Sequence, residues 1–361
     1  MKQGLTRHRE RSARIQIDGE ALRHNLGRVK ACAPSSKVMA VIKANAYGHD
    51  VLAAASYLDA ADAFALAMPA EAVALRRAGC SRPLIVLQGF ANQEELKLCS
   101  RYDLQPVIHQ QWQAELLYSA SRFSLDVWLK IDTGMHRLGV PLEAVDQAYQ
   151  TLKSAAVVHS IKFMSHFANA DDPNHQLNNN QLQSFINVIP ESDAQRSIAN
   201  SAAVISNAGS HLEWVRPGIM LYGSSPLPGR SAEELGLRPV MQFESRLAAI
   251  QHVRKGETIG YGSTWQCPED MPVGVVAAGY GDGYPRHAPS GTPVWINGHL
   301  CPGVGRVSMD SICVDLRGVD ATHGDRAVLW GRELPVDTVA GHAGTISYEL
   351  LCHAGNTANP G

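Results

Sequence analysis

The chain of 361 residues is longer than one hydrophobic core usually supports, so we expect two domains, or one large barrel with a small domain. With 45% apolar residues, 18% charged residues and a formal net charge of −2, the composition is that of an ordinary globular protein. It has no charge bias that would favour nucleic acid or a membrane surface as a partner. No run of about 18 uncharged apolar residues occurs, so no transmembrane span is expected.

The N-terminus and the cysteines point to a cytoplasmic protein. Residues 1–13 are basic, but they lack the apolar stretch and cleavage site of a signal peptide, so we expect a flexible arm. The seven cysteines are scattered and form no C-x-x-C pair, which is typical of free thiols in a reducing compartment. The 15 histidines include no H-E-x-x-H motif, and no metal site is expected.

From residue 37 to residue 223, strand-like apolar runs alternate with helical stretches. The strand-like runs are residues 37–43, 63–68, 83–89, 104–109, 125–132, 157–167, 196–200 and 214–223. The helical stretches are residues 50–60, 69–79, 93–101, 110–120, 142–154 and 174–189. Eight repeats of strand then helix predict a (β/α)₈ barrel, because parallel strands need crossover helices. The same pattern also fits a doubly wound open sheet. We assign the barrel to residues 14–235.

The pattern changes after a stretch rich in Pro, Gly and Ser that follows residue 223. Short alternating segments separated by tight turns occupy the rest of the chain, and Asn297-Gly298 is a strong signal for a type I′ hairpin. Residues 236–361 are therefore predicted to form a smaller, mostly antiparallel β domain.

Polar side chains stand at the ends of several strand-like runs, where a barrel of this kind carries its chemistry. They are Lys43, Lys130, Asp132, His166, Asn200 and Arg216. Singly, each has an ordinary structural explanation, such as a solvated lysine or a histidine with its hydrogen bonds satisfied. Their shared position indicates a functional site, because a ring of cations and a histidine there has little structural purpose.

A lysine that ends a buried strand loses hydration, so its pKa can fall and the free amine can attack an aldehyde. Lys43 in "VIKANAYGHD" therefore fits a Schiff base with pyridoxal phosphate. Barrels tend to bind a phosphate after strands seven and eight, where Ser201 opens a helix and Gly218 and Ile219 offer backbone amides. Taken alone, "NSA" is better explained as a helix N-cap.

Nine motifs over residues 14–351, nearly the whole chain, together resemble the pyridoxal-phosphate alanine racemases. They are "VIKANAYGHD", "KIDTGMHRLG", "MSHFANADD", "NSAA", "VRPGIMLYG", "IGYGSTW", "AGYGDGYPR", "VGRVSMD" and "TISYEL". The resemblance implies an enzyme that interconverts L-alanine and D-alanine and supplies D-alanine for bacterial peptidoglycan. Racemisation needs a base on each face of the substrate, and the resemblance assigns these roles to Lys43 and Tyr261. Because the family's tyrosine comes from the partner subunit, it also implies a homodimer with shared sites.

The resemblance implies a cofactor site built from both domains. Arg216 would face the pyridine nitrogen, where an arginine donates to an unprotonated nitrogen and favours reprotonation over transamination. His166 would lie near the ring. Around the phosphate the resemblance places Tyr47, Ser201, Gly218, Ile219 and Tyr348.

The substrate side of the site follows in the same way. Arg137 and Met309 would contact the substrate, and Lys130 would be carbamylated, which turns a cation into an anion beside Arg137. Tyr261 would need hydrogen bonds or positive charge near it, because a phenol is a poor base at neutral pH. The resemblance supplies His166 and Arg216 as those neighbours.

Other readings of the sequence stay open. A broader-specificity racemase that also accepts serine is hard to separate from an alanine racemase, although such enzymes usually carry export signals. A related barrel decarboxylase would be expected to have an acidic residue in place of Arg216, and a non-catalytic cofactor carrier would lack the second domain. The sequence ends "HAGNTANPG" after "TISYELLC", where family members usually continue to a final strand, which puts the last strand and the dimer contact in question.

Overall fold

The computed structural model describes residues 12–190 and 194–358. Residues 1–11 of the expected arm therefore lie outside the described residues. The chain divides into two compact units, Gly19–Arg238 and Met1–Asp18 with Pro239–Gly361. This division falls close to the expected one at residues 235 and 236, but residues 14–18, which were expected in the barrel, fall in the unit with the C-terminal segment.

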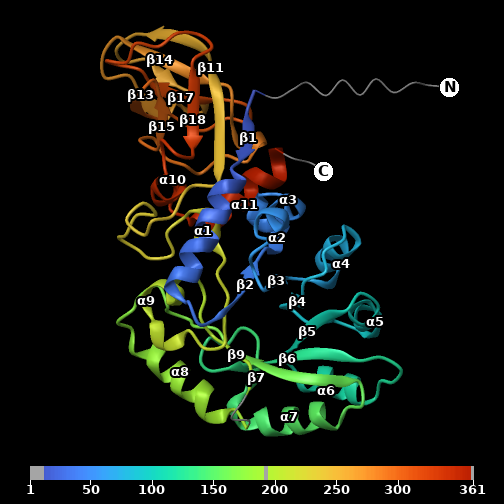
Figure 1. The fold of residues 1–361 in the computed structure, drawn as a ribbon. Coiled ribbons are helices and arrows are strands. Elements are labelled where there is room, and N and C mark those ends of the chain that lie inside the picture. The colour runs from blue at the N-terminus through green and yellow to red at the C-terminus, as the bar shows by residue number, and fades with distance from the viewer. Residues whose placement is uncertain (1–11, 191–193, 359–361) are drawn as a thin grey trace, which may run out of the picture. The chain divides into compact units, whose positions relative to one another are not determined.

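The unit Gly19–Arg238 is a closed barrel of eight parallel strands (Figure 1). The strands are β2 (Lys37–Val41), β3 (Ala63–Leu66), β4 (Leu84–Val86), β5 (Leu104–Ile108), β6 (Leu125–Asp132), β8 (Val158–Met164), β9 (Arg196–Ser197) and β10 (Trp214–Val215). They run in the order β5-β4-β3-β2-β10-β9-β8-β6, and pairing of β5 with β6 closes the ring. Every expected strand is present, and closure excludes the open sheet. A short β7 (Val140–Pro141) pairs in parallel with the last two residues of β6, Ile131 and Asp132.

Helices connect the strands and cover the outside of the barrel, as α6, α7 and α8 do around β6 and β9 in Figure 1. The helices are α1 (Gly19–Cys32), α2 (Lys43–Gly48), α3 (Val51–Tyr57), α4 (Pro69–Arg77), α5 (Gln93–Arg101), α6 (Gln111–Tyr118), α7 (Val145–Ser154), α8 (Gln176–Val188) and α9 (Ser201–Ser206). Strands covered in this way are apolar on both faces. Accordingly, all residues of β3 and β4 are buried.

Helix α1 was not expected from the sequence. It buries Ala21, Leu22, Leu26 and Val29 at helical spacing, but Asn25 interrupts this stripe. The Asn25 side chain donates to the carbonyl oxygens of residues 221 and 238, so burial leaves it satisfied. A polar residue in the apolar stripe, together with several basic residues, weakened the periodic signal.

The other unit is built around a long strand, β11 (Met241–Val253), in a mostly antiparallel sheet. The sheet also contains β1 (Arg14–Ile17), β14 (Met271–Val276), β15 (Pro293–Ile296), β16 (His299–Pro302), β17 (Ile312–Asp315) and β18 (Arg326–Trp330). Strands β12 (Thr258–Ile259) and β13 (Trp265–Gln266) form a separate hairpin. The expected antiparallel domain is confirmed, with two helices that the sequence did not predict, α10 (Val336–Ala343) and α11 (Ser347–Ala358).

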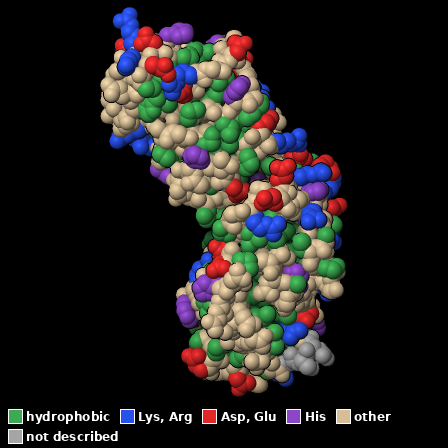
Figure 2. Space-filling model, turned by 90° about the vertical axis from the view of Figure 1, so that its left-hand side faces the viewer, with side chains coloured by type: hydrophobic (Ala, Val, Ile, Leu, Met, Phe, Trp, Pro, Cys, Tyr) green, Lys and Arg blue, Asp and Glu red, His purple; other side chains and the backbone are tan. Residues whose placement is uncertain are grey.

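No described helix is both long enough and apolar enough to cross a membrane. On the face shown in Figure 2, Lys and Arg side chains are interspersed with Asp and Glu. The described part of the chain also contains no group of three or more His, Cys, Asp or Glu side chains that could hold a metal ion.

The hairpin between β15 and β16 gives a test of the predicted turn. Asn297 and Gly298 have φ values of 46° and 88°, as a type I′ turn requires, and a Cβ on Gly298 would meet no atom within 4 Å. Replacing Gly298 with alanine should therefore lower the free energy of unfolding by about 1 kcal/mol through backbone strain alone. Urea denaturation would measure the change.

Gly341→Ala is the matched control in the same unit. Gly341 lies inside α10, and a Cβ there would also meet no atom within 4 Å. Because alanine is the better helix former, the free energy of unfolding of this variant should rise by about 0.5–1 kcal/mol. Equal shifts of the two variants in one direction would contradict the assigned turn.

Candidate active site

Lys43 follows the end of β2 directly after Ile42, at the carboxyl end of the barrel strands. The four residues after it, 44–47, have φ values of 52–54° and form what we call the left-handed turn. This conformation costs roughly 1–2 kcal/mol per non-glycine residue, so the surroundings must hold it. The backbone N–H of Ala44 donates to Glu71 Oε1 over 2.8 Å, and the Asn45 side chain accepts from the N–H of Val51 over 2.9 Å.

Arg216 lies just after β10 and is 5% exposed. Its guanidinium donates to Ser197 Oγ over 2.7 Å and to the carbonyl oxygen of Ser165 over 2.5 Å. The same group lies 3.2 Å from His166 Nδ1. Because an arginine can only donate, His166 Nδ1 must accept and carry no hydrogen. Burial lowers the pKa of Arg216 to about 10, so the guanidinium stays charged at neutral pH.

His166 is held neutral by its surroundings. Burial, followed by the positive charges of Arg216 and Lys130, lowers the pKa of His166 well below its ordinary value. A neutral ring agrees with its role as hydrogen-bond acceptor from Arg216. At this carboxyl end of the barrel strands, the positive charge of the pair is therefore on the Arg216 guanidinium and not on the His166 imidazole.

Lys130, near the end of β6, completes the cationic cluster. Burial, and then the charges of Arg216, Arg137 and Lys43, lower the pKa of Lys130 to about 8. A sizeable fraction of its amine is therefore neutral near physiological pH. The structure thus brings Lys43, Arg137 and Arg216 close enough to Lys130 for their charges to act on it.

Asp132 is oriented toward the loop that follows β6. Burial would raise the pKa of Asp132, but hydrogen bonds from the backbone N–H groups of His136 and Gly134 outweigh it and lower that pKa. The ionised carboxylate accepts both bonds over 3.0 Å. Asp132 thus shapes the chain just before Arg137, whose side chain is exposed.

Hydroxyl and backbone donors gather near the start of α9. Asn200 caps this helix by accepting from the N–H of Ala203, as expected. The Ser201 hydroxyl accepts from the N–H of Gly218 over 2.8 Å, and its own hydrogen can donate to another acceptor. A Cβ on Gly218 would lie 2.6 Å from the Tyr47 hydroxyl oxygen, so only glycine allows this approach. Ile219 follows directly and is fully buried.

Gln181 is a residue of this region that the sequence reasoning missed. It lies on α8, is fully buried, and donates to the carbonyl oxygen of His166 over 3.0 Å and to Thr133 Oγ1 over 3.2 Å. The Thr133 hydroxyl in turn forms a hydrogen bond with the Ser165 hydroxyl, and the carbonyl oxygen of Ser165 accepts from the Arg216 guanidinium. A signal existed, because Gln181 falls in the buried stripe of α8 that also contains Asn178, Leu182 and Phe185.

Tyr261, Met309 and Tyr348 lie in the other unit, with exposed fractions of 69%, 54% and 37%. Tyr261 stands in the loop between β12 and β13, flanked by Gly260 and Gly262 with φ values of 73° and 74°. Both φ values lie in the left-handed region, which L side chains rarely adopt, so the backbone on either side of Tyr261 favours glycine. The loop thus presents the Tyr261 phenol to solvent in the isolated chain.

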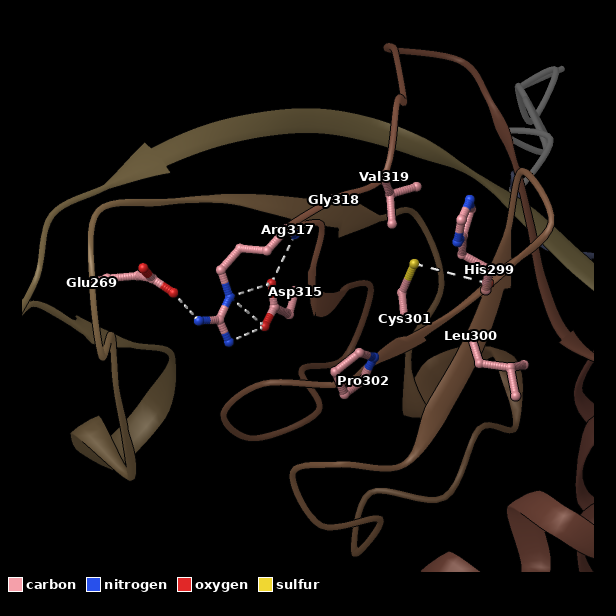
Figure 3. Close-up of a pocket in the computed structure, with 9 residues that line it drawn as sticks. All are labelled: Glu269, His299, Leu300, Cys301, Pro302, Asp315, Arg317, Gly318 and Val319. Carbon is pink, nitrogen blue, oxygen red and sulfur yellow. Dashed lines mark hydrogen bonds and ion pairs between the residues drawn. The ribbon is translucent and has the colours of Figure 1, made fainter.

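A separate pocket of about 540 Å³ lies in the same unit (Figure 3). It is lined by Glu269, His299, Leu300, Cys301, Pro302, Asp315, Arg317, Gly318 and Val319. Arg317 bonds Asp315 over 2.7–3.1 Å and also bonds Glu269, so its positive charge is already matched. None of the expected site residues lines this pocket.

Comparisons with known proteins cover both units. The family model for the alanine racemase N-terminal domain matches residues 17–226, and that for the C-terminal domain matches residues 240–359. The alanine racemase of Nitrosococcus oceani is 51% identical over 93% of this chain and 95% of its own. The alanine racemase of Shewanella sediminis is 49% identical over 94% of this chain and 95% of its own. The crystal structure of the biosynthetic alanine racemase from Pseudomonas aeruginosa is 43% identical, with a TM-score of 0.93 over 95% of this chain and 97% of that one.

Proposed function

The chain belongs to the alanine racemase family and interconverts L-alanine and D-alanine, and we propose that it does so with Lys43 and Tyr261 as the two bases around pyridoxal phosphate. The observation that carries the proposal is that the charges of Arg216, Arg137 and Lys43 all act on Lys130, and that these four cations all act on His166, at one end of the barrel. A cluster of cations there suits a cofactor and a substrate that both bear negative charge.

The barrel residues fit the cofactor. The Ser201 and Tyr47 hydroxyls and the backbone amide of Ile219 are the kinds of donor that bind phosphate. The expected amide of Gly218 donates to Ser201 Oγ instead, so Gly218 would contribute by lacking the Cβ that would fill this place. Lys43 would hold the aldehyde carbon. We propose that Tyr348, from the other unit, completes the phosphate site, as the family resemblance implies.

When bound, pyridoxal phosphate weakens the Cα–H bond of an amino acid that is joined to it. The protein must then remove a proton from one face of Cα and return one to the other. The Lys43 amine, which would also hold the cofactor, would serve one face. The Tyr261 phenol would serve the opposite face.

Arg216 would keep the reaction on racemisation. Its hydrogen bonds to Ser197 and Ser165 fix the guanidinium, and burial still leaves it charged at neutral pH. A fixed cation can only donate to the pyridine nitrogen, so this nitrogen would stay unprotonated. With that nitrogen unprotonated, the negative charge left at Cα would be less delocalised, which would favour return of the proton to Cα over transamination.

Tyr261 lies on a different unit from Lys43, and we propose that the working site combines two chains in a homodimer. A C2 dimer contributes the same residues twice, so two equivalent sites would form. We further propose a cytoplasmic enzyme that supplies D-alanine for peptidoglycan.

The basic test of the function follows the optical activity of L-alanine and of D-alanine, with exchange of the α proton in deuterated water, in the presence of pyridoxal phosphate. Both enantiomers should lose optical activity and take up deuterium. Serine measured beside alanine would separate an alanine racemase from one of broader specificity. Release of carbon dioxide without racemisation would instead indicate a decarboxylase.

Lys130 gives a prediction of its own. We propose that its amine forms a carbamate, which would place a negative charge beside Arg137 and relieve the repulsion among the cations. Enzyme freed of carbon dioxide should therefore lose activity and recover it when bicarbonate is added. At a fixed concentration of dissolved carbon dioxide the recovery should speed up as the pH rises toward about 8, because the neutral amine attacks carbon dioxide with release of a proton and the pKa of Lys130 is about 8.

Lys130→Glu supplies the control, since it carries a permanent carboxylate. Its activity should not respond to bicarbonate. Wild-type enzyme whose activity is equally indifferent, with density or intact mass that shows an unmodified Lys130, would rule out the carbamate.

A further inference from the structure

His49 directly follows the segment that carries Lys43, and it is fully buried. Its Nδ1 lies 3.0 Å from the carbonyl oxygen of Ala46 and 2.9 Å from that of Tyr47. Carbonyl oxygens can only accept, so Nδ1 carries the hydrogen and His49 donates to both. The other ring nitrogen, Nε2, is buried without a hydrogen-bond partner among the described residues.

The His49 ring also belongs to an aromatic stack. Tyr222 stacks on His49 with ring centroids 4.6 Å apart and on Tyr47 with centroids 4.7 Å apart. The Tyr222 hydroxyl donates to the carbonyl oxygen of Val41 over 3.0 Å. Tyr222 therefore contacts the chain on both sides of Lys43. It bonds the end of β2 before Lys43 and stacks on Tyr47 of the left-handed turn after it.

His49 is suited to a fixed donor and not to proton transfer. Burial lowers the pKa of His49 to about 4, although its two backbone hydrogen bonds act in the opposite direction. The ring is thus neutral at physiological pH and keeps its single hydrogen on Nδ1. Its Nε2 is buried away from solvent.

The His49 side chain helps to hold the left-handed turn. Four successive non-glycine residues hold a conformation that L-amino acids disfavour, and buried carbonyl groups are costly without a partner. The Ala46 carbonyl also accepts from the backbone N–H of His49 over 3.1 Å, so the specific contribution of the His49 side chain is its bond to the Tyr47 carbonyl at the end of the turn. Loss of this tie would let the turn relax toward ordinary backbone conformations and change the direction of the Lys43 side chain.

We propose that His49 is a positioning residue for the racemase reaction, and that its Nδ1–H holds the left-handed turn so that the Lys43 amine and the Tyr47 hydroxyl point into the site. The proposal rests on the role proposed above for Lys43. It assigns no proton transfer to His49 itself.

Three variants separate the donor from the ring. His49→Asn keeps an N–H donor near the position of Nδ1 but loses the ring. His49→Phe keeps the stack with Tyr222 but has no donor, and His49→Gln moves the donor toward the position of Nε2. We expect His49→Asn to retain kcat for alanine within about threefold, and His49→Phe and His49→Gln to lose about 10- to 100-fold, because a misplaced catalytic group costs that much.

The readouts are kcat and KM for both enantiomers, the affinity for pyridoxal phosphate, and the visible absorption of the bound cofactor. The donor-deficient variants should lose kcat with little change in KM, bind the cofactor more weakly, and show a shifted absorption. A purely structural role would instead lower the melting temperature of the cofactor-free protein and leave kcat per folded molecule unchanged. His24→Phe is the control, since His24 also bonds a backbone carbonyl, that of Gly236 over 2.8 Å, but lies on α1.

The outcomes are distinct. Full kcat in His49→Phe, or an equal loss in His49→Asn and His49→Gln, would overturn the proposal. If His49→Phe does not fold, the Asn and Gln variants still decide the question. Wild-type enzyme without activity, or Lys43→Ala with full activity, would instead count against the proposed function, whereas normal behaviour of those two proteins confines any failure to His49.

Discussion

Lys43→Ala is expected to reduce alanine racemisation by about 10³-fold or more in both directions. The variant loses a base, which is typically worth about 10²–10⁴-fold, and also the amine proposed to hold the cofactor. The visible absorption of bound pyridoxal phosphate should weaken or shift, and exchange of the α proton in deuterated water should fall with turnover. Optical rotation and mass spectrometry of recovered alanine would measure both effects.

Two further variants separate the amine from its charge. Lys43→Arg keeps a cation just before the left-handed turn but cannot supply a neutral amine, so it should be as inactive as Lys43→Ala. Small amines such as methylamine should restore part of the activity of Lys43→Ala by acting as the missing base. Lys97→Ala, which removes an exposed lysine on α5, should behave as wild type. If Lys43→Ala kept the visible absorption of bound pyridoxal phosphate and full turnover, the assignment of Lys43 as a base and cofactor-binding residue would be wrong.

Much of the fold could be predicted because the periodic signal was strong where burial was complete. The buried strands β3 and β4 read as continuous apolar runs, and helices with clear stops, such as α4 between Pro69 and Gly79, punctuate them. Helix α1 escaped prediction because Asn25 interrupts its buried stripe, and the side-chain hydrogen bonds of Asn25 join it to residues 221 and 238, about 200 positions away. A sequence does not display such distant partners.

The C-terminal unit shows the same limit. The type I′ turn at Asn297-Gly298 was predictable because its backbone conformation depends on two residues alone. The place of β1 in this unit was not, since it depends on pairing of residues 14–17 with β11. Local conformation was therefore readable, and pairing between distant segments was not.

The candidate site divides in a similar way. Lys43 and Arg216 could be singled out because each follows an apolar strand, and the mouth of a barrel collects such positions. The left-handed turn, the bond between Gln181 and the His166 carbonyl, and the lowered pKa of Lys130 all arise from packing between separate elements. They are the features that turn a ring of polar residues into a site with defined protonation states.

Tyr261→Phe is expected to lower kcat by about 10²–10⁴-fold in both directions, because racemisation needs a base on each face. The change removes one oxygen from a side chain that is 69% exposed, so folding should be unaffected. Binding of pyridoxal phosphate should also persist. Exchange of the α proton with deuterium should survive for the one enantiomer whose proton faces Lys43, which would make the two enantiomers unequal. Tyr118→Phe, on α6 and 59% exposed, is the matched control.

Mixing of inactive chains tests where Tyr261 acts. If each site takes Lys43 from one chain and Tyr261 from its partner, a mixed dimer of Lys43→Ala and Tyr261→Phe chains contains one site with both residues intact. Since about half of randomly paired dimers are mixed and one of their two sites is complete, activity should return to about a quarter of wild type. If both residues came from the same chain, every site would lack one of them and no activity would return. A Tyr261→Phe enzyme with unimpaired turnover in both directions would remove the second base from the mechanism while leaving the family assignment in place.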